Sequence, residues 1–173
     1  MMTMKKQFVL LALLCLLGFS ACQKKNVPLF RGDYSFKTSG VVTLEEIMPE
    51  NAAEVGDQLT VSLLNEIGQL EISALDHGQD SVVVVMNTMG GEVVVTHALC
   101  HDNEIFFRDF KKNTLLFTGD SITLRNELNV SASGRMYEDN TLIINMVYDG
   151  EAESNNRSFH IYGEDIRMVA LRN

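Results

Sequence analysis

The chain contains 173 residues, of which 46% are hydrophobic and 21% are charged. This length predicts a single domain with a sizeable core, and this balance of apolar and charged residues excludes intrinsic disorder. The formal net charge is -9, which is opposite in sign to the basic surface that binding to a phosphate backbone requires, so nucleic acid is excluded as a partner.

Residues 1–21 have the features of a cleavable export signal. Lys5 and Lys6 form a basic start, and Phe8–Phe19 is an apolar run that small residues separate from Cys22. A helix that spans a bilayer needs about 20 apolar residues, and this run is shorter. The pattern therefore predicts a signal peptide that is removed from the mature chain.

The segment Leu17–Cys22 resembles the lipobox of bacterial lipoproteins, in which small residues precede an obligatory cysteine. The resemblance implies that the Cys22 thiol receives a diacylglyceryl group, that cleavage follows Ala21, and that the new amino terminus is acylated. Several acyl chains together are sufficient for stable attachment to a membrane. The alternative is an ordinary secretory signal whose cleavage site precedes a cysteine by chance.

Residues 22–31 are predicted to form a tether, of which Gln23–Pro28 is basic and extended. The signal takes away two lysines and no acidic residue, so the mature chain is more negative than the full sequence. Anionic headgroups repel such a chain, and the lipid on Cys22 must hold it at the membrane. Lys24 and Lys25 lie where some lipoproteins of the outer cell face carry acidic residues. This favours a lipid anchor in the outer membrane that faces the periplasm.

Beyond the tether the dominant hydrophobic period is two, which is typical of half-buried strands. In Tyr34–Thr38 and Leu70–Ala74, larger and mostly apolar residues alternate with polar or charged ones. Val82–Met86 and Val93–Val95 are instead continuous apolar runs, and they predict strands that are covered on both faces. The intervening Asn87–Gly91 ends in two glycines, so the two runs are predicted to form a hairpin.

Residues 32–173 are predicted to form one all-β domain. Segment 49–67 is ambiguous, and we expect an irregular acidic stretch followed by a strand or a short helix. No internal repeat is present, and closing or doubling a sheet removes its exposed edges, so we predict a single antiparallel barrel or sandwich of about eight to ten strands. Further predicted strands are Glu104–Phe107, Thr114–Phe117, Ser121–Leu124, Glu127–Ala132, Thr141–Tyr148, Ser158–Tyr162 and Ile166–Leu171.

The signal, the start Gly32–Tyr34, the many short strands and the end Met168–Asn173 make the chain similar to small all-β lipoproteins of Bacteroidetes, some of which belong to calycin-like barrel families. The resemblance favours a calycin- or lipocalin-like barrel over a sandwich. It implies an antiparallel barrel that encloses a small apolar molecule. It assigns a functional role to no numbered residue of the domain.

The segment Phe117–Thr123 resembles the serine block of the GDSL hydrolases. Those enzymes need the serine early in the chain and an Asp-x-x-His near the end. Here Ser121 comes late, and Arg157 occupies the position three residues before His160. The catalytic triad cannot be assembled in this order, so the segment is predicted to be a turn that opens a strand, and the domain is predicted not to be an enzyme.

His97, Cys100 and His101 raise the question of a metal site. In a strand, His97 and His101 share a face but lie about 13 Å apart, and Cys100 points the opposite way. One ion cannot join them within this strand, so neither a metal nor another cofactor is predicted. Cys15 leaves with the signal and Cys22 carries lipid, so Cys100 has no intramolecular partner. It is predicted to be a small buried apolar residue, with a reactive or intermolecular thiol as the alternative.

An acidic cluster lies between positions 45 and 57 of the chain. Its spacing lacks the alternating aspartates of a calcium loop, so a solvated charged loop is predicted. His77 and His160 are expected to be structural. The cluster comprises Glu45, Glu46, Glu50, Glu54 and Asp57.

Two functional hypotheses follow from these features. The first is a lipid-anchored, non-enzymatic barrel that binds a small apolar ligand, and a cavity of about 300 Å³ or more would favour it. The second is a structural, assembly or adhesion lipoprotein that acts through a protein interface, which a filled core would favour. Phe106 and Phe107 must face opposite sides, so one belongs to the core and the other to a cavity or a partner surface. The absence of Trp weakens a sugar-binding role but leaves tyrosine contacts open.

Overall fold

The computed structural model describes residues 27–48, 56–63, 66–75, 80–118, 122–154 and 157–173. In these residues the chain forms one antiparallel sheet and a single short helix, which confirms the predicted all-β class. The sheet closes on itself because β1 pairs with β4 on one side and with β11 on the other. The elements are α2 (Val27–Phe30), β1 (Gly32–Ser39), β2 (Val41–Glu46), β3 (Gln58–Ser62), β4 (Glu66–Ala74), β5 (Ser81–Thr88), β6 (Val93–His101), β7 (Glu104–Phe107), β8 (Phe110–Thr118), β9 (Ile122–Met136), β10 (Thr141–Ser154) and β11 (Arg157–Arg172).

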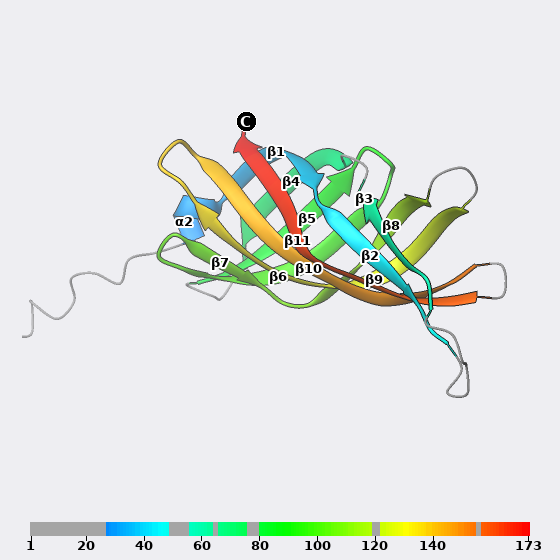
Figure 1. The fold of residues 1–173 in the computed structure, drawn as a ribbon. Helices are drawn as coiled ribbons and strands as arrows, with labels where there is room; N and C mark the ends of the chain where they lie inside the picture. The colour runs from blue at the N-terminus through cyan, green and yellow to red at the C-terminus, as the bar shows by residue number, and fades with distance from the viewer. Residues whose placement is uncertain (1–26, 49–55, 64–65, 76–79, 119–121, 155–156) are drawn as a thin grey trace, which may run out of the picture.

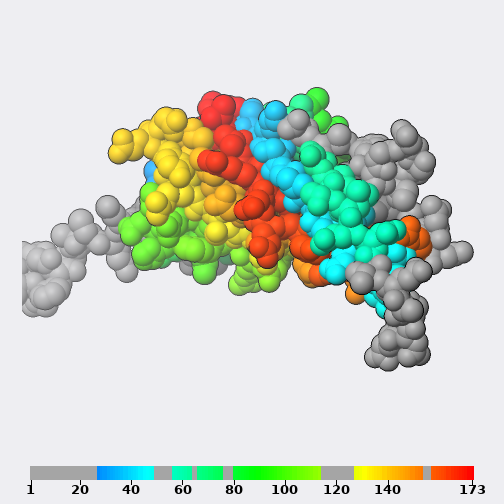
Figure 2. Space-filling model, in the orientation of Figure 1, coloured from blue at the N-terminus to red at the C-terminus, as the bar shows by residue number. Residues whose placement is uncertain are grey.

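Eight strands form the closed barrel, in the order β1, β4, β5, β6, β7, β9, β10 and β11 (Figure 1). The other three strands lengthen this wall, because β2 follows β1, β3 precedes β4 and β8 follows β7 along the chain. The architecture fits the calycin-like barrel that the resemblance implied, and it excludes the sandwich. Figure 2 shows β10, β11, β1 and β2 as a continuous outer surface.

Side chains alternate between the barrel interior and the outer surface along each strand. In β1, the alternate residues that the sequence predicted to be inward are buried. The prediction that both faces are covered is wrong for Val93–Val95, because Val93 is 61% and Val95 is 59% exposed. In Val82–Met86 the outward-facing Val83 and Val85 are half-buried. The continuous apolar run in β6 therefore forms an exposed apolar outer surface.

The ambiguous segment forms a strand at Gln58–Ser62, while residues 49–55 lie outside the described part of the chain. The predicted hairpin is confirmed as β5 and β6. Its turn contains Gly91 with a φ of 85°, which glycine adopts without steric cost. The predicted strands Thr114–Phe117 and Glu127–Ala132 fall within the longer β8 and β9.

One end of the barrel is closed by α2, which lies against the start of β1 (Figure 1). Phe30 is fully buried, and its carbonyl oxygen accepts a 2.5 Å hydrogen bond from the Tyr34 hydroxyl. Residues 22–31 were predicted to form the tether, but Val27–Phe30 packs against the barrel. This segment packs there because Val27 and Phe30 place their apolar side chains on the buried side of a single helical turn.

Arg172, near the end of β11, connects the last strand to α2 and β1 at this end of the barrel. Its guanidinium lies 5.2 Å from the centroid of the Tyr34 ring and donates a 2.7 Å hydrogen bond to the Tyr34 hydroxyl. Arg172 also donates to the carbonyl oxygen of Leu29. The two chain segments that carry the calycin-like resemblance therefore contact each other directly.

At the other end the wall divides. β9 pairs with β10 only as far as Asn129 and Asp149, and beyond this point β9 pairs with β8 while β10 pairs with β11. The two hairpins diverge there (Figure 1). Leu128 packs at the fork, because a Cβ on Gly150 would lie 2.6 Å from its Cδ2 atom. We call the part that contains β2, β3, β8 and the strand segments paired with them the open half, and the remainder with α2 the closed half.

Candidate functional site

The interior of the closed half is filled by side chains. Seven of its inward-facing residues are large and have less than 2% of their surface exposed. Such packing stabilises the barrel, and the described closed half serves as its scaffold. These residues are Phe30, Tyr34, Leu70, Ile72, Ile105, Leu142 and Ile144.

A charged cluster lies inside the barrel where the two halves meet. Lys112 has the same inward orientation as Phe110, two residues earlier, and its side chain is 2% exposed. Its Nζ atom donates to Glu66 Oε1 at 2.6 Å and to Glu92 Oε2 at 3.4 Å. Burial of an ammonium group is costly unless it is paired, and these two carboxylates supply the pairing.

The cluster exists because β5 and β6 end before β8 does. Beyond the backbone hydrogen bond from Arg108 to His97, the described β8 forms its ladder with β9 alone. Glu92 compensates from the β5–β6 turn, since its Oε1 atom accepts 2.6 Å and 3.2 Å hydrogen bonds from the backbone and side-chain N–H groups of Asn113. A carboxylate thus replaces the missing neighbouring strand.

Two buried hydroxyl groups adjoin these charges. Thr38 is opposite Glu66 in the β1–β4 register, and its buried Oγ1 atom has no hydrogen-bond partner among the described residues. The Tyr148 hydroxyl donates a weak hydrogen bond to the Met146 sulfur at 4.0 Å. Burial raises the pKa of Tyr148, and the nearby carboxylates of Glu66 and Glu92 raise it further. Together, Thr38, Glu66, Glu92, Lys112 and Tyr148 form what we call the polar layer.

The polar layer separates two apolar regions. Below it lies the filled closed half, and above it the open half presents inward side chains that are also apolar and buried. The layer keeps unused hydrogen-bonding capacity at Thr38 and Tyr148, which an unoccupied apolar core would not require. It is therefore suited to orient the polar group of a molecule whose remainder is apolar. The inward residues of the open half include Val42, Leu44, Val61, Ala152, Phe159 and Ile161.

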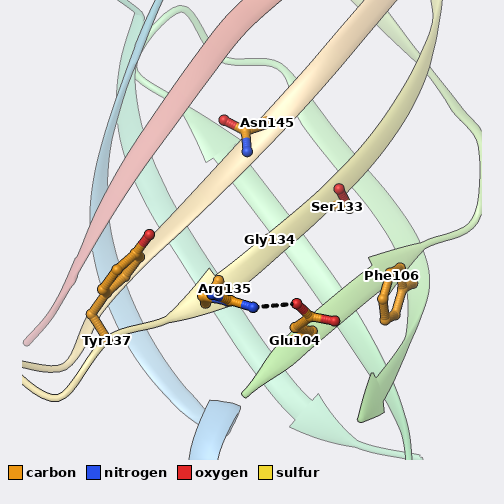
Figure 3. Close-up of a pocket in the computed structure, with 7 residues that line it drawn as sticks. All are labelled: Glu104, Phe106, Ser133, Gly134, Arg135, Tyr137 and Asn145. Carbon is orange, nitrogen blue, oxygen red and sulfur yellow. Dashed lines mark hydrogen bonds and ion pairs between the residues drawn. The ribbon is translucent and has the colours of Figure 1, made fainter. Parts of the chain in front are cut away.

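A concave site lies on the outer wall of the closed half, across β7, β9 and β10 (Figure 3). Its volume is about 290 Å³. Arg135 donates a 2.6 Å hydrogen bond to Glu104 at its centre. Figure 3 shows Tyr137 on one side of this ion pair and Phe106 on the other. The depression is lined by Glu104, Phe106, Ser133, Gly134, Arg135, Tyr137 and Asn145.

The structure separates the residues that the sequence considered for metal binding. His97 and His101 are exposed on the outer face of β6, and Cys100 is buried on its inner face, as predicted. Among the described residues, no group of three or more His, Cys, Asp or Glu side chains is placed to hold a metal ion. His160 instead lies 2.8 Å from Asp149 on the surface.

The acidic cluster is only partly the solvated loop that the sequence predicted. Glu46 and Asp57 both accept hydrogen bonds from Arg157 of β11, at 2.5 Å and 2.6 Å. The hydrogen bond from Arg157 lowers the pKa of Glu46. These ion pairs form because β2 pairs with the start of β11, which brings Arg157 beside Glu46, 111 positions away in sequence.

Several predicted features lie outside the described residues. These are the signal 1–21, the lipidation site Cys22, the acidic residues Glu50 and Glu54, the turn histidine His77 and the hydrolase-like serine Ser121. In the part of the chain that is described, no helix has the length and apolar character needed to cross a bilayer. No protein-family model and no curated protein matches the chain.

Phe106 and Phe107 face opposite sides, as predicted. Phe107 packs against the core and lies 6.5 Å from Phe110 between ring centroids, whereas Phe106 lines the outer depression. The polar layer was not predicted from the sequence. The pattern that could have indicated it is the position of Lys112, which lies two residues after Phe110 and therefore on the same face of a strand.

Proposed function

We propose that this chain is a lipid-anchored, non-enzymatic binding protein of the cell envelope, and that its open half takes up a small, largely apolar molecule. The observation that carries the proposal is the polar layer. Apolar binding sites with a few convergent polar groups are the usual form of small-molecule sites in proteins. Here the apolar walls come from the open half, and the convergent groups are those of Thr38, Lys112 and Tyr148.

The unpartnered hydroxyl of Thr38 supports this assignment. A buried hydroxyl without a hydrogen bond destabilises the folded state by about 1–3 kcal/mol. A ligand with one polar group at its inner end would supply the missing partner. The ligand's apolar part would then contact the inward residues of the open half, such as Leu44 and Ile161.

A lipid on Cys22 would set the orientation of the barrel. Cys22 is five positions before Val27, and an extended chain of this length reaches at most about 18 Å. Because α2 belongs to the closed end, the anchor would hold the closed half beside the membrane. The open half would face the aqueous compartment, where a ligand can enter.

Native mass spectrometry of protein purified from its own host tests the binding proposal. We expect a co-purifying small molecule whose occupancy falls in Ala152→Phe, because Ala152 is buried inside the open half. Val147→Phe is the matched control, since Val147 lies on the same strand and is exposed. A ligand-free mass for the native protein would overturn the proposal.

The anchor is tested separately by Cys22→Ser. Attachment of radiolabelled fatty acid and partition into detergent should both disappear in this variant. Partition equal to that of the unaltered protein would exclude the lipid anchor while leaving the ligand proposal intact.

A protein interface is the second candidate function, and one observation favours it. The outer face of β6 and β7 presents a group of exposed apolar side chains, namely Val93, Val95, Leu99 and Phe106. Contiguous apolar patches of this kind often mark interaction surfaces. A ligand-free mass with a defined oligomer or a bound protein, lost in Val95→Glu, would support this candidate in place of the first.

A further inference from the structure

The outer depression has features that the proposed internal site does not use. Phe106 is 46% and Tyr137 is 47% exposed, although aromatic side chains gain most by being buried. They flank the Arg135–Glu104 ion pair on opposite sides of the depression (Figure 3). The site therefore combines two accessible aromatic surfaces with hydrogen-bonding groups between them.

The frame around the depression is held by backbone hydrogen bonds. Tyr137 accepts at its carbonyl oxygen from the backbone N–H of Asn140 at 3.0 Å and donates its own N–H to Thr141 at 2.9 Å. The N–H of Met136 donates to Asn103 at 2.8 Å, which joins β9 to the β6–β7 turn. The two sides of the depression are thus positioned before any ligand arrives, and this reduces the entropy lost on binding.

The polar groups of the depression are balanced. Arg135 and Glu104 neutralise each other, and they still offer free N–H donors and carboxylate lone pairs. Ser133 and Asn145 add a hydroxyl and an amide, each of which donates and accepts. Such a set recognises an uncharged molecule that carries many hydroxyl groups.

We propose that this depression binds a neutral saccharide. A sugar ring has an apolar C–H face that packs on an aromatic ring and hydroxyl groups that bond to polar side chains at its edge. The volume of about 290 Å³ lies at the lower end of the range for small-molecule sites, which is roughly 300–1,000 Å³. It suits one or two sugar units at the end of a longer chain.

Other ligand classes fit this site less well. An anion would have to displace Glu104 from Arg135, and a purely apolar molecule would desolvate the charged pair without replacing its hydrogen bonds. The inference concerns the outer wall of the closed half and does not depend on the proposed internal ligand.

Isothermal titration calorimetry with neutral trisaccharides of glucose, mannose, galactose and N-acetylglucosamine tests the proposal. We expect at least one to bind with millimolar to micromolar affinity. Phe106→Ala and Tyr137→Ala should each weaken that binding by at least about tenfold. Leu171→Ala is the control, because Leu171 is equally exposed on the wall but outside the depression.

Circular dichroism establishes that each variant is folded. Failure of all four trisaccharides to bind overturns the proposal, as does binding that both aromatic variants retain. Selective binding of an extended peptide at the same side chains would identify the depression as a protein contact instead.

Discussion

The two halves of the barrel are built from the same alternating strands but differ in how their walls are completed. In the closed half, eight strands form an uninterrupted ring, and α2, Tyr34 and Arg172 seal its end. In the open half, the wall divides between β9 and β10, and the Glu92 carboxylate accepts a hydrogen bond from the backbone N–H of Asn113 in place of a neighbouring strand. We therefore expect the closed half to contribute more to stability than the open half, to which the binding proposal assigns the ligand.

Leucine-to-alanine substitutions in the two halves should give the largest difference in the free energy of unfolding. Leu70 and Leu44 are both buried, the first in the closed half and the second in the open half. We expect Leu70→Ala to lower the free energy of unfolding by about 4 kcal/mol and Leu44→Ala by about 2 kcal/mol, because a divided wall collapses more easily around a cavity. Urea denaturation followed by circular dichroism measures both. Equal losses would contradict the division into scaffold and binding half.

Removal of the buried lysine should have the next largest effect. Lys112→Met leaves Glu66 and Glu92 without their cation, and we expect a loss of about 3 kcal/mol in the free energy of unfolding. The adjacent Lys111 pairs with Glu127 on the surface, so Lys111→Met should cost less than about 1 kcal/mol. Similar losses in the two variants would show that the polar layer contributes no special link between the halves.

Loss of the Tyr34 hydrogen bonds at the closed end should have a smaller effect on stability. Tyr34→Phe removes the hydroxyl that bonds to Phe30 and Arg172, and we expect a loss of about 1–2 kcal/mol in the free energy of unfolding. Tyr162 in β11 has an exposed hydroxyl bond to Gln58, and Tyr162→Phe should stay within about 0.5 kcal/mol of the unaltered protein. A Tyr34→Phe variant as stable as this control would remove the argument for a sealed end.

The smallest expected effect is on the pH dependence of stability, through a buried thiol in the closed half. Burial raises the pKa of Cys100 to about 11 from 9.0, with a further contribution from Asp80. The protonated thiol is favoured in the folded state, so its contribution to stability is present below pH 9 and is lost as the pH rises toward 11. Burial also raises the pKa of Tyr34, which acts in the same direction. Cys100→Ala should therefore reduce, without abolishing, the fall in melting temperature on the alkaline side.

The reactivity of the thiol provides a second measurement of the same group. Because the thiolate is the reactive form, native Cys100 should react with iodoacetamide far more slowly than the unfolded chain at pH 8. Equal labelling rates for native and unfolded protein would show that the site is accessible and that burial does not control it.

Hydrophobic alternation was sufficient to predict the strands of the barrel wall, because the apolar residues of each strand mark the face that points inward. It predicted that Phe106 and Phe107 face opposite sides and that Cys100 is buried. It failed for Val93 and Val95, since a β-branched residue favours a strand whether or not its outer face is covered.

The two candidate sites depend on register between distant strands, which local pattern does not contain. Lys112 and Glu66 are 46 positions apart in the chain and meet only inside the closed barrel. In the same way, Arg135 and Glu104 are 31 positions apart and become neighbours through the β7–β9 pairing. Arg157 was considered only for its place before His160, and its two acidic partners emerge from the β2–β11 register.

The seam between β1 and β11 limits the order in which the barrel can form. Tyr34 pairs with Arg172 across 138 positions of sequence, so the ring cannot close until the last strand is available. Closing the ring therefore requires a long-range encounter between the two ends of the domain, and contacts of this kind slow folding.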